Sequence, residues 1–247
     1  MWDRIKADFS NWEAKNPIEN TFINNCIFNA DSLYESVAFV LSNKISTHLL
    51  IVQDWIQLFN KAYNNSDYLR TSLEQDLQAI LDRDFACTRI SDPLLHYNGF
   101  HGLQLQRLAN YFFKNGIYAT SSLIHDRMIS CCSMDIHPAV PVGLGTVIDH
   151  GIGVVIGETA RIGNNVFMYH NVTLGSNGTI GGDRHPTIED DVLLGSNTSI
   201  LGNITIGKGS AVAAGSIVTK SVPPEVLVAG NPAKEIGPAK EFQKKGH

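Results

Sequence analysis

Between residues 136 and 222 a small or branched apolar residue recurs at every sixth position, and few folds can use such a repeat. An amphipathic helix needs apolar residues three and four positions apart, and a half-buried strand needs strict alternation, so neither pattern fits. Glycine and asparagine stand between the short β-branched stretches, where they turn the chain. Each hexad therefore forms one side of a coil, whose aliphatic residues stack inward on those of the next coil. One series contains Val142, Ile148, Val154, Ala160, Val166 and Val172, and a second contains Leu144, His150, Ile156, Ile162, Met168 and Leu174.

The repeat is interrupted after Leu174. Ile188 follows Leu174 by 14 residues, two more than a multiple of six, so the segment at about 176–187 leaves the coil as a loop. This loop contains Gly181-Gly182-Asp183-Arg184-His185-Pro186, in which the glycines allow the backbone to approach a ligand closely and the proline stiffens the exit. Because loops on rigid scaffolds often carry binding residues, we expect a binding site here.

His150 occupies a position at which the rest of its series carries leucine, isoleucine or methionine. A regular register would turn its imidazole into an apolar core, which is costly without a polar partner. The following Gly151-Ile152-Gly153 could instead let the backbone bulge and turn the side chain outward. The sequence alone leaves both orientations open, although the adjacent Asp149 favours a polar site.

Residues 1 to about 130 have the apolar spacing of helices. Asn98-Gly99 predicts a turn between two helices, and Gly116 predicts the end of the helix that begins near Phe100. His48, His96, His101 and His125 are expected to be structural or surface residues. One predicted helical face consists of Leu33, Val37, Val40, Leu41 and Ile45.

Composition excludes several classes of protein. A net charge of −5 argues against broad binding to nucleic acids or membranes. The four cysteines lack metal-ligand spacing, and the adjacent pair Cys131 and Cys132 is a poor candidate for a disulfide, so we expect a reduced, cytoplasmic protein. No leader peptide is expected, and the longest apolar runs fall short of a membrane span.

Several short motifs, in this order and spacing, resemble serine O-acetyltransferase. In and next to the repeat they are Asp135-Ile136-His137-Pro138, Ile148-Asp149-His150-Gly151, Gly157-Glu158-Thr159-Ala160 and the Gly181 to Pro186 loop motif, followed in the C-terminal segment by Gly230-Asn231-Pro232-Ala233. The upstream matches are Asp76-Leu77-Gln78-Ala79, Gly99-Phe100-His101 and, more faintly, Ser42-Asn43-Lys44-Ile45.

The resemblance implies an α+β protein with an all-helical N-terminal domain over residues 1–134, used for oligomerisation. A left-handed parallel β-helix with the extruded loop follows over 135–222, and a C-terminal segment over 223–247. It implies a homotrimer or a dimer of trimers, with active sites in the clefts between neighbouring coils. It also implies transfer of the acetyl group of acetyl-CoA to L-serine, giving O-acetyl-L-serine and CoA for cysteine synthesis, with cysteine as feedback inhibitor.

The chemistry of this reaction indicates roles for particular residues. A serine hydroxyl needs a base to take its proton as it attacks the thioester, and the imidazole of His150 has a suitable pKa. Asp135 matches the family position that holds the other imidazole nitrogen, so the two are predicted to form a dyad. No activated cysteine is required, so the acetyl group is expected to pass directly between the two bound substrates.

The substrate-binding residues follow from the charges of serine. Its carboxylate requires a fixed cation, for which Arg184 offers a two-pronged donor and His185 a further one. Its ammonium requires carboxylates, and the matching positions are Asp84 and Asp149. For CoA, the resemblance indicates Gly195, Ser196 and Ala214 along the pantetheine arm, and Gly175 and Gly178 are further predicted contacts. The CoA phosphates require nearby cations, for which Lys220 and Lys234 are the candidates.

The chain departs from the family at several places, among them Phe85, which replaces a common proline after Asp84. Ser176-Asn177-Gly178-Thr179 replaces a run that ends in lysine, which puts CoA contacts and the acyl preference in question. His170 replaces a common glutamine. The terminal Lys244-Lys245-Gly246-His247 lacks the isoleucine with which many relatives bind O-acetylserine sulfhydrylase, so that complex is not expected.

Two alternatives remain from the sequence. One is an acyltransferase of the same fold that acts on homoserine or a sugar, or that uses another acyl-CoA. The other is a zinc enzyme similar to γ-carbonic anhydrase, suggested by His137, His150, His170 and His185. The paired-histidine spacing of such zinc sites is absent, so no metal is expected.

Overall fold

The computed structural model describes residues 1–178 and 181–240. It divides into two compact units, Met1–Tyr97 and Asn98–His247. The sequence placed the domain boundary at 134/135, and the helices do give way to strands between Cys132 and Met134. The last two helices nevertheless belong to the same compact unit as the strands.

The first unit is helical, and several of its helices begin at a polar capping residue. The side chains of Asn16, Ser32 and Ser66 each accept a hydrogen bond from a backbone N–H in the first turn. The predicted apolar face at 33–45 is buried. The elements are α1 (Trp2–Ala7), α2 (Pro17–Ile23), a π-helix (Asn24–Phe28), α3 (Leu33–Ile45), α4 (Val52–Asn64), α5 (Asp67–Arg83) and α6 (Ser91–His96).

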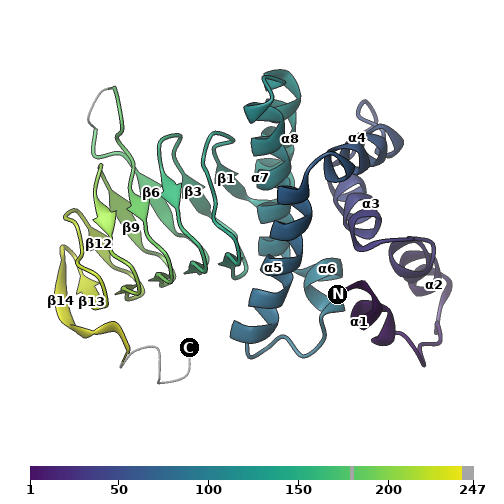
Figure 1. Cartoon of the computed structure of the whole chain (residues 1–247), viewed down its shortest axis with the longest axis horizontal. Helices are drawn as coiled ribbons and strands as arrows, with labels where there is room; N and C mark the ends of the chain where they lie inside the picture. Colours follow the sequence, from purple (N-terminus) through teal and green to yellow (C-terminus); the bar gives the residue numbers. More distant parts are fainter. Residues whose placement is uncertain (179–180, 241–247) are drawn as a thin grey trace. The chain divides into compact units, whose positions relative to one another are not determined.

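The second unit begins with α7 (Asn98–Lys114) and α8 (Tyr118–Cys132), which pack against each other beside the first strands (Figure 1). The predicted turn at Asn98-Gly99 is wrong, because both residues are already in the first turn of α7 and only Tyr97 separates α6 from α7. Gly116, at φ +74°, follows the end of α7 as predicted. Gln106 and Arg107 of α7 are buried and donate hydrogen bonds to carbonyl oxygens of residues 140–143.

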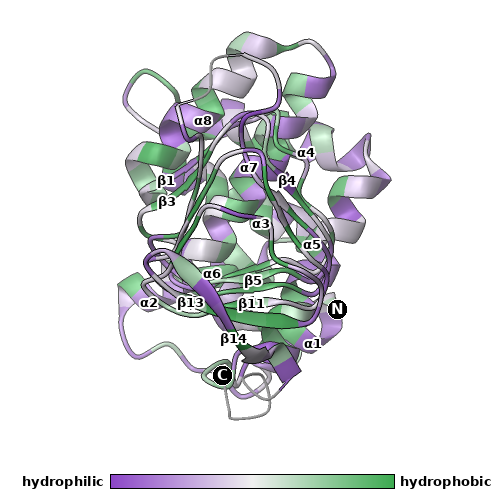
Figure 2. Ribbon diagram, turned by 90° about the vertical axis from the view of Figure 1, so that its left-hand side faces the viewer, coloured by the Kyte–Doolittle hydropathy of each residue, from purple (hydrophilic) through white to green (hydrophobic). Residues whose placement is uncertain are grey.

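The remainder of the second unit is a parallel β-helix of three sheets, as the hexapeptide repeat predicts. Figure 2 shows these sheets as three sides around a common interior. The first contains β1 (Met134–Ile136), β3 (Val154–Ile156), β6 (Thr173–Gly175), β9 (Ser199–Leu201) and β12 (Ile217–Val218). The second contains β4 (Arg161–Ile162), β7 (Thr187–Ile188) and β10 (Thr205–Ile206). The third contains β2 (Val147–Ile148), β5 (Phe167–Met168), β8 (Leu193–Leu194), β11 (Ala211–Val212), β13 (Val226–Gly230) and β14 (Ala233–Pro238), the last pairing antiparallel to β13.

The strand pairing reveals two interruptions of the repeat. Residues that pair on successive regular coils are 18 positions apart in the sequence, as Ile156 and Leu174 are. Across the predicted loop the offset is 26, as in Ile162 opposite Ile188, and the loop occupies the residues between β6 and β7. A smaller interruption precedes it, because Ile148 lies opposite Met168, an offset of 20.

This earlier interruption shows that the predicted series from Leu144 through His150 to Ile156 is wrong. The two additional residues fall between Ile148 and Val154, so Leu144 and His150 do not share a ladder position with Ile156. Ile136, Val142 and Ile148 hold the equivalent positions instead, opposite Ile156, Ile162 and Met168. The coil core therefore stays aliphatic, with these residues at most 5% exposed.

Candidate active site

His150 lies at the corner between β2 and β3 and points away from the core. Its backbone adopts φ +58°, Gly151 follows at φ +78°, and the side chain is 68% exposed. A non-glycine residue in the left-handed region is uncommon and often marks a functional position. Of the two orientations left open by the sequence, the structure has the outward one.

The start of α7 holds this corner in place. The Asn98 side-chain amide donates hydrogen bonds to the carbonyl oxygens of His150, at 3.1 Å, and of Cys132, at 2.9 Å. A Cβ on Gly99 would lie 1.9 Å from the carbonyl oxygen of Ile148, so only glycine allows this approach. Sequence reasoning missed Asn98, since its contact with the corner depends on tertiary structure.

Two further side chains surround the His150 imidazole. The Asp149 carboxylate lies 3.7 Å from His150 Nε2, and the His170 ring lies edge-on with its centroid 5.7 Å away. Nδ1 of His170 is buried and has no hydrogen-bond partner among the described residues. We refer to Asp149, His150 and His170 as the histidine corner.

A second group of polar residues forms where the loop docks on the turn between β3 and β4. Oγ1 of Thr159 accepts hydrogen bonds from the backbone N–H groups of Arg184, at 3.1 Å, and His185, at 3.2 Å. The Arg184 guanidinium donates to Glu158 at 2.8 Å. A Cβ on Gly157 would lie 2.1 Å from His185 Nε2, so this glycine makes room for the imidazole. We refer to Glu158, Thr159, Arg184 and His185 as the arginine cluster.

The arginine cluster shifts the pKa values of His185 and Glu158. Burial and the neighbouring Arg184 lower the pKa of His185 below its usual value, which favours a neutral imidazole. The backbone N–H of Thr159 donates to Nδ1 of His185, so the proton of the neutral ring is on Nε2. The hydrogen bond from Arg184 lowers the pKa of Glu158, which therefore stays ionised.

Asp135 lies on β1, opposite Val155 of β3, and its side chain is half exposed. Its Oδ1 accepts a hydrogen bond from Nε2 of His125 on α8 at 2.9 Å. Within residues 1–178 and 181–240 of one chain, no hydrogen bond or ion pair joins Asp135 to His150. The predicted dyad stays a prediction, and His125, expected only to be a structural or surface residue, lies beside its carboxylate.

Asp84, predicted to bind the substrate ammonium, belongs to the first unit. It follows α5 directly, and its carboxylate accepts a hydrogen bond from the backbone N–H of Ala86 at 2.9 Å. Its predicted role stays a prediction.

The residues predicted for CoA lie on several coils. Gly195 and Ser196 neighbour Ala214 on the next coil: a Cβ on Gly195 would lie 2.5 Å from the Ala214 nitrogen, and Gly215 N donates to the Ser196 carbonyl at 2.8 Å. Gly175 ends β6, and its carbonyl accepts from Gly202.

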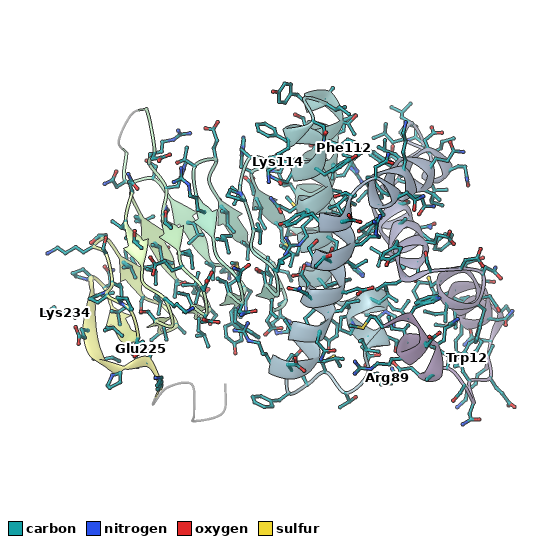
Figure 3. All side chains as sticks on the ribbon, viewed as in Figure 1. Trp12, Arg89, Phe112, Lys114, Glu225 and Lys234 are labelled. Carbon is teal, nitrogen blue, oxygen red and sulfur yellow. The ribbon has the colours of Figure 1, made fainter. Side chains whose placement is uncertain are left out.

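The other predicted CoA contacts are exposed. Gly178 adopts φ +90° at the start of the loop, and Lys220 follows β12. Lys234 lies on β14, at the end of the coil away from α7 (Figure 3). Thr179 and the terminal 244–247 segment lie outside the described residues. These assignments stay predictions.

In the part of the chain that the structure describes, no three His, Cys, Asp or Glu side chains gather so that they could hold a metal ion. No helix among the same residues is long and apolar enough to span a bilayer. A parallel β-helix of hexapeptide repeats with an exposed histidine and an extruded loop defines the class as a hexapeptide-repeat acyltransferase.

Comparison with known proteins identifies the family within this class. The family model described as "Serine acetyltransferase, N-terminal" matches residues 1–105, and that described as "Bacterial transferase hexapeptide (six repeats)" matches residues 185–220. Serine acetyltransferase 2 of Arabidopsis thaliana is 42% identical over 96% of this chain and 73% of its own length. The chain belongs to the serine acetyltransferase family.

Solved structures agree with this assignment. A serine acetyltransferase from Brucella abortus strain S19 in complex with coenzyme A has a TM-score of 0.93 and 39% identity, covering 96% of this chain and 95% of the other. Soybean serine acetyltransferase complexed with serine has a TM-score of 0.92 and 40% identity, covering 95% and 97%.

Proposed function

We propose that this chain transfers the acetyl group of acetyl-CoA to the hydroxyl of L-serine, giving O-acetyl-L-serine and CoA, the first step of cysteine biosynthesis. The observation that carries the proposal is the outward-turned imidazole of His150 at a corner that otherwise belongs to an aliphatic coil. Relatives solved with serine and with coenzyme A, similar over nearly the whole chain, support both substrates.

His150 acts as the general base in this mechanism. Its imidazole takes the hydroxyl proton of serine as the oxygen attacks the thioester carbonyl, forming a tetrahedral intermediate. Collapse of the intermediate breaks the C–S bond, and the CoA thiolate leaves and receives the proton from the imidazolium. Atoms and charge balance without a covalent acyl-enzyme.

Asp135 is proposed to hold His150 from a second copy of the chain. Within one chain Asp135 is bonded to His125, whereas His150 lies beside Asp149 and His170. A dyad of Asp135 and His150 therefore requires two coils side by side, as in the homotrimer that the family resemblance implies. A dimer of trimers is a further expectation of that resemblance.

Serine is proposed to bind between the histidine corner and the arginine cluster. The Arg184 guanidinium, fixed by Glu158, pairs with the substrate carboxylate, and the Nε2 proton of His185 adds a neutral donor. Asp149 and Asp84 receive the ammonium. Cysteine carries the same carboxylate and ammonium, so it is expected to compete at this site as a feedback inhibitor.

CoA is proposed to lie along the coils that contain Gly175, Gly195, Ser196 and Ala214, with Gly178 at the loop and Lys220 and Lys234 near its phosphates. The loop segment at Ser176-Asn177-Gly178 has no lysine, so acetyl-CoA affinity depends more on backbone contacts than on a cation there. The expectation that the chain forms no complex with O-acetylserine sulfhydrylase stays a prediction, as does a cytoplasmic location.

The deciding experiment measures thiol release from acetyl-CoA with serine, homoserine and a sugar as acceptors, and from a longer acyl-CoA with serine. Serine with acetyl-CoA should give the highest kcat/KM, and His150→Ala should lower kcat by at least about 100-fold, the lower range for loss of a general base. Turnover with another acceptor but not with serine would disprove the substrate assignment. Near-normal kcat in His150→Ala would disprove the mechanism.

A further inference from the structure

We propose that His125 on α8 is a positioning residue that fixes the carboxylate of Asp135 for its partner histidine. The inference rests on the proposed function, because it assigns His125 a role only through the dyad of Asp135 and His150. Neither the repeat nor the motifs pointed to His125.

The contact between the two side chains is direct. Nε2 of His125 lies 2.9 Å from Oδ1 of Asp135. An ionised carboxylate can only accept, so Nε2 carries the hydrogen whether the ring is neutral or charged. Oδ2 takes no part in this bond, and the Asp135 side chain is 50% exposed, so a second donor can reach it.

Both partners are held by rigid elements. Asp135 lies in the middle of β1, which pairs with β3 over three residues. The His125 side chain is only 21% exposed, and its ring lies edge-on to that of His137, with centroids 6.1 Å apart. His137 in turn packs edge-on against Phe113 of α7, also at 6.1 Å.

The short link between α8 and β1 adds to this rigidity. Ser133 turns the chain with a left-handed conformation at φ +54°, and its carbonyl accepts from Gly153 N at 2.8 Å. The helix that carries His125 is thus fixed to the coil that carries Asp135.

The expected consequence is a loss of catalytic rate with little loss of substrate binding. A half-exposed carboxylate without His125 is free to change rotamer, so fewer of its conformations align Oδ2 with a base. We expect His125→Ala to lower kcat about tenfold and to leave the KM for acetyl-CoA within about twofold, as misalignment alone predicts.

The test compares His125→Ala, His125→Gln, Asp135→Asn and the double variant His125→Ala/Asp135→Asn in the full chain. A glutamine amide can donate to Oδ1 but does not titrate, so His125→Gln should recover most of the lost kcat. The double variant should be no slower than Asp135→Asn alone. Asp126→Asn, an exposed change on the same helix, is the matched control, and Tm is measured for every variant.

The outcomes separate the two proposals. Normal kcat in His125→Ala with impaired Asp135→Asn would overturn the role of His125 and leave the dyad. A loss in His125→Ala that glutamine does not recover, or that adds fully to Asp135→Asn, would reduce His125 to a structural residue and overturn the inference. Normal kcat in Asp135→Asn would remove the dyad and the inference together.

Discussion

At the scale of single residues, the outward turn of His150 comes from backbone conformation as much as from side-chain chemistry. Two additional residues in this coil, with Gly151 at φ +78° and Gly153 at φ +74°, let the chain leave the ladder and return to it. The cost of a left-handed histidine, of order 1 kcal/mol, is offset by the contacts that hold the corner.

Asn98 provides two of those contacts, so Asn98→Ala should destabilise the corner. The change leaves the carbonyl oxygens of Cys132 and His150 without their side-chain donor, and the free energy of unfolding should fall by about 1–3 kcal/mol. kcat should fall as well, because His150 loses its fixed position. Urea unfolding and steady-state kinetics measure both effects.

Asn115→Ala is the matched control, since that amide donates an exposed, local hydrogen bond to the carbonyl oxygen of Tyr111. Equal losses in the two alanine variants would contradict a specific role for Asn98.

A pH dependence of stability follows from His185. Its pKa is lowered in the folded chain, so the folded state binds fewer protons than the unfolded state once the pH falls below about 6.5, the ordinary histidine value. The stability contributed by the neutral ring is full above that pH and is lost as the pH falls through the folded pKa.

The measurement is urea unfolding at pH 7.5 and at pH 5. The wild-type chain should lose more unfolding free energy between these values than His185→Gln, whose side chain does not titrate. An equal or larger loss in His185→Gln would show that protonation of His185 does not weaken the fold.

At the scale of elements, α7 and the coil fit together through glycine. Gly99 and Gly102 both face the coil, but they meet different obstacles. A Cβ at 99 would meet the backbone carbonyl of Ile148 at 1.9 Å, whereas a Cβ at 102 would meet the flexible Met134 side chain at 2.2 Å. A backbone carbonyl fixed in a parallel sheet cannot move aside as a methionine side chain can.

Gly99→Ala and Gly102→Ala therefore form a matched pair on one helix. Gly99→Ala should cost about 1–3 kcal/mol of stability through overpacking, together with much of kcat, because α7 must shift against the His150 corner. Gly102→Ala should cost less, since Met134 can repack and alanine is about 1 kcal/mol better than glycine in a helix. Larger losses from Gly102→Ala, by urea unfolding and kinetics, would contradict this account.

At the scale of the whole molecule, the chain separates the predicted catalytic groups. The histidine corner lies at the turns that precede β3 and β6, and the arginine cluster lies at the turn after β3 and in the loop after β6, while Asp135 is engaged by His125. One coil thus presents two incomplete halves of the proposed site, and two adjacent coils would complete it.

Mixing two inactive variants tests this arrangement. His150→Ala and Asp135→Asn chains carrying different tags are co-expressed, and oligomers with both tags are purified. In a trimer each shared site would take His150 from one chain and Asp135 from its neighbour. A mixed trimer contains two chains of one variant and one of the other, and either mixture leaves one site with both residues intact. About one third of wild-type kcat should therefore return. Sedimentation measures the oligomer's mass. Mixed oligomers no more active than their parents would contradict a dyad formed between chains.

The sequence alone was sufficient to predict the class of fold and the position of the loop. Residues spaced by six can bury their side chains only in stacked coils, and the 14-residue interval after Leu174 can only be a loop if the ladder is kept. It also singled out His150, because an imidazole has no place among stacked aliphatic residues. The series from Ile136 through Val142, Ile148 and Val154 also continues at six-residue spacing, so the spacing could not reveal the bulge at His150.

The orientation of His150 and the contacts that hold it depend on packing between distant segments, which the sequence pattern does not report. The registers that begin at Val142 and at Leu144 differ by two residues and both continue at six-residue spacing, so strand pairing had to choose between them. Asn98 lies 52 residues from His150 and binds its carbonyl group, which no side-chain pattern reports. His125 meets Asp135 because α8 folds back onto β1, a contact fixed by packing between elements rather than by any local propensity.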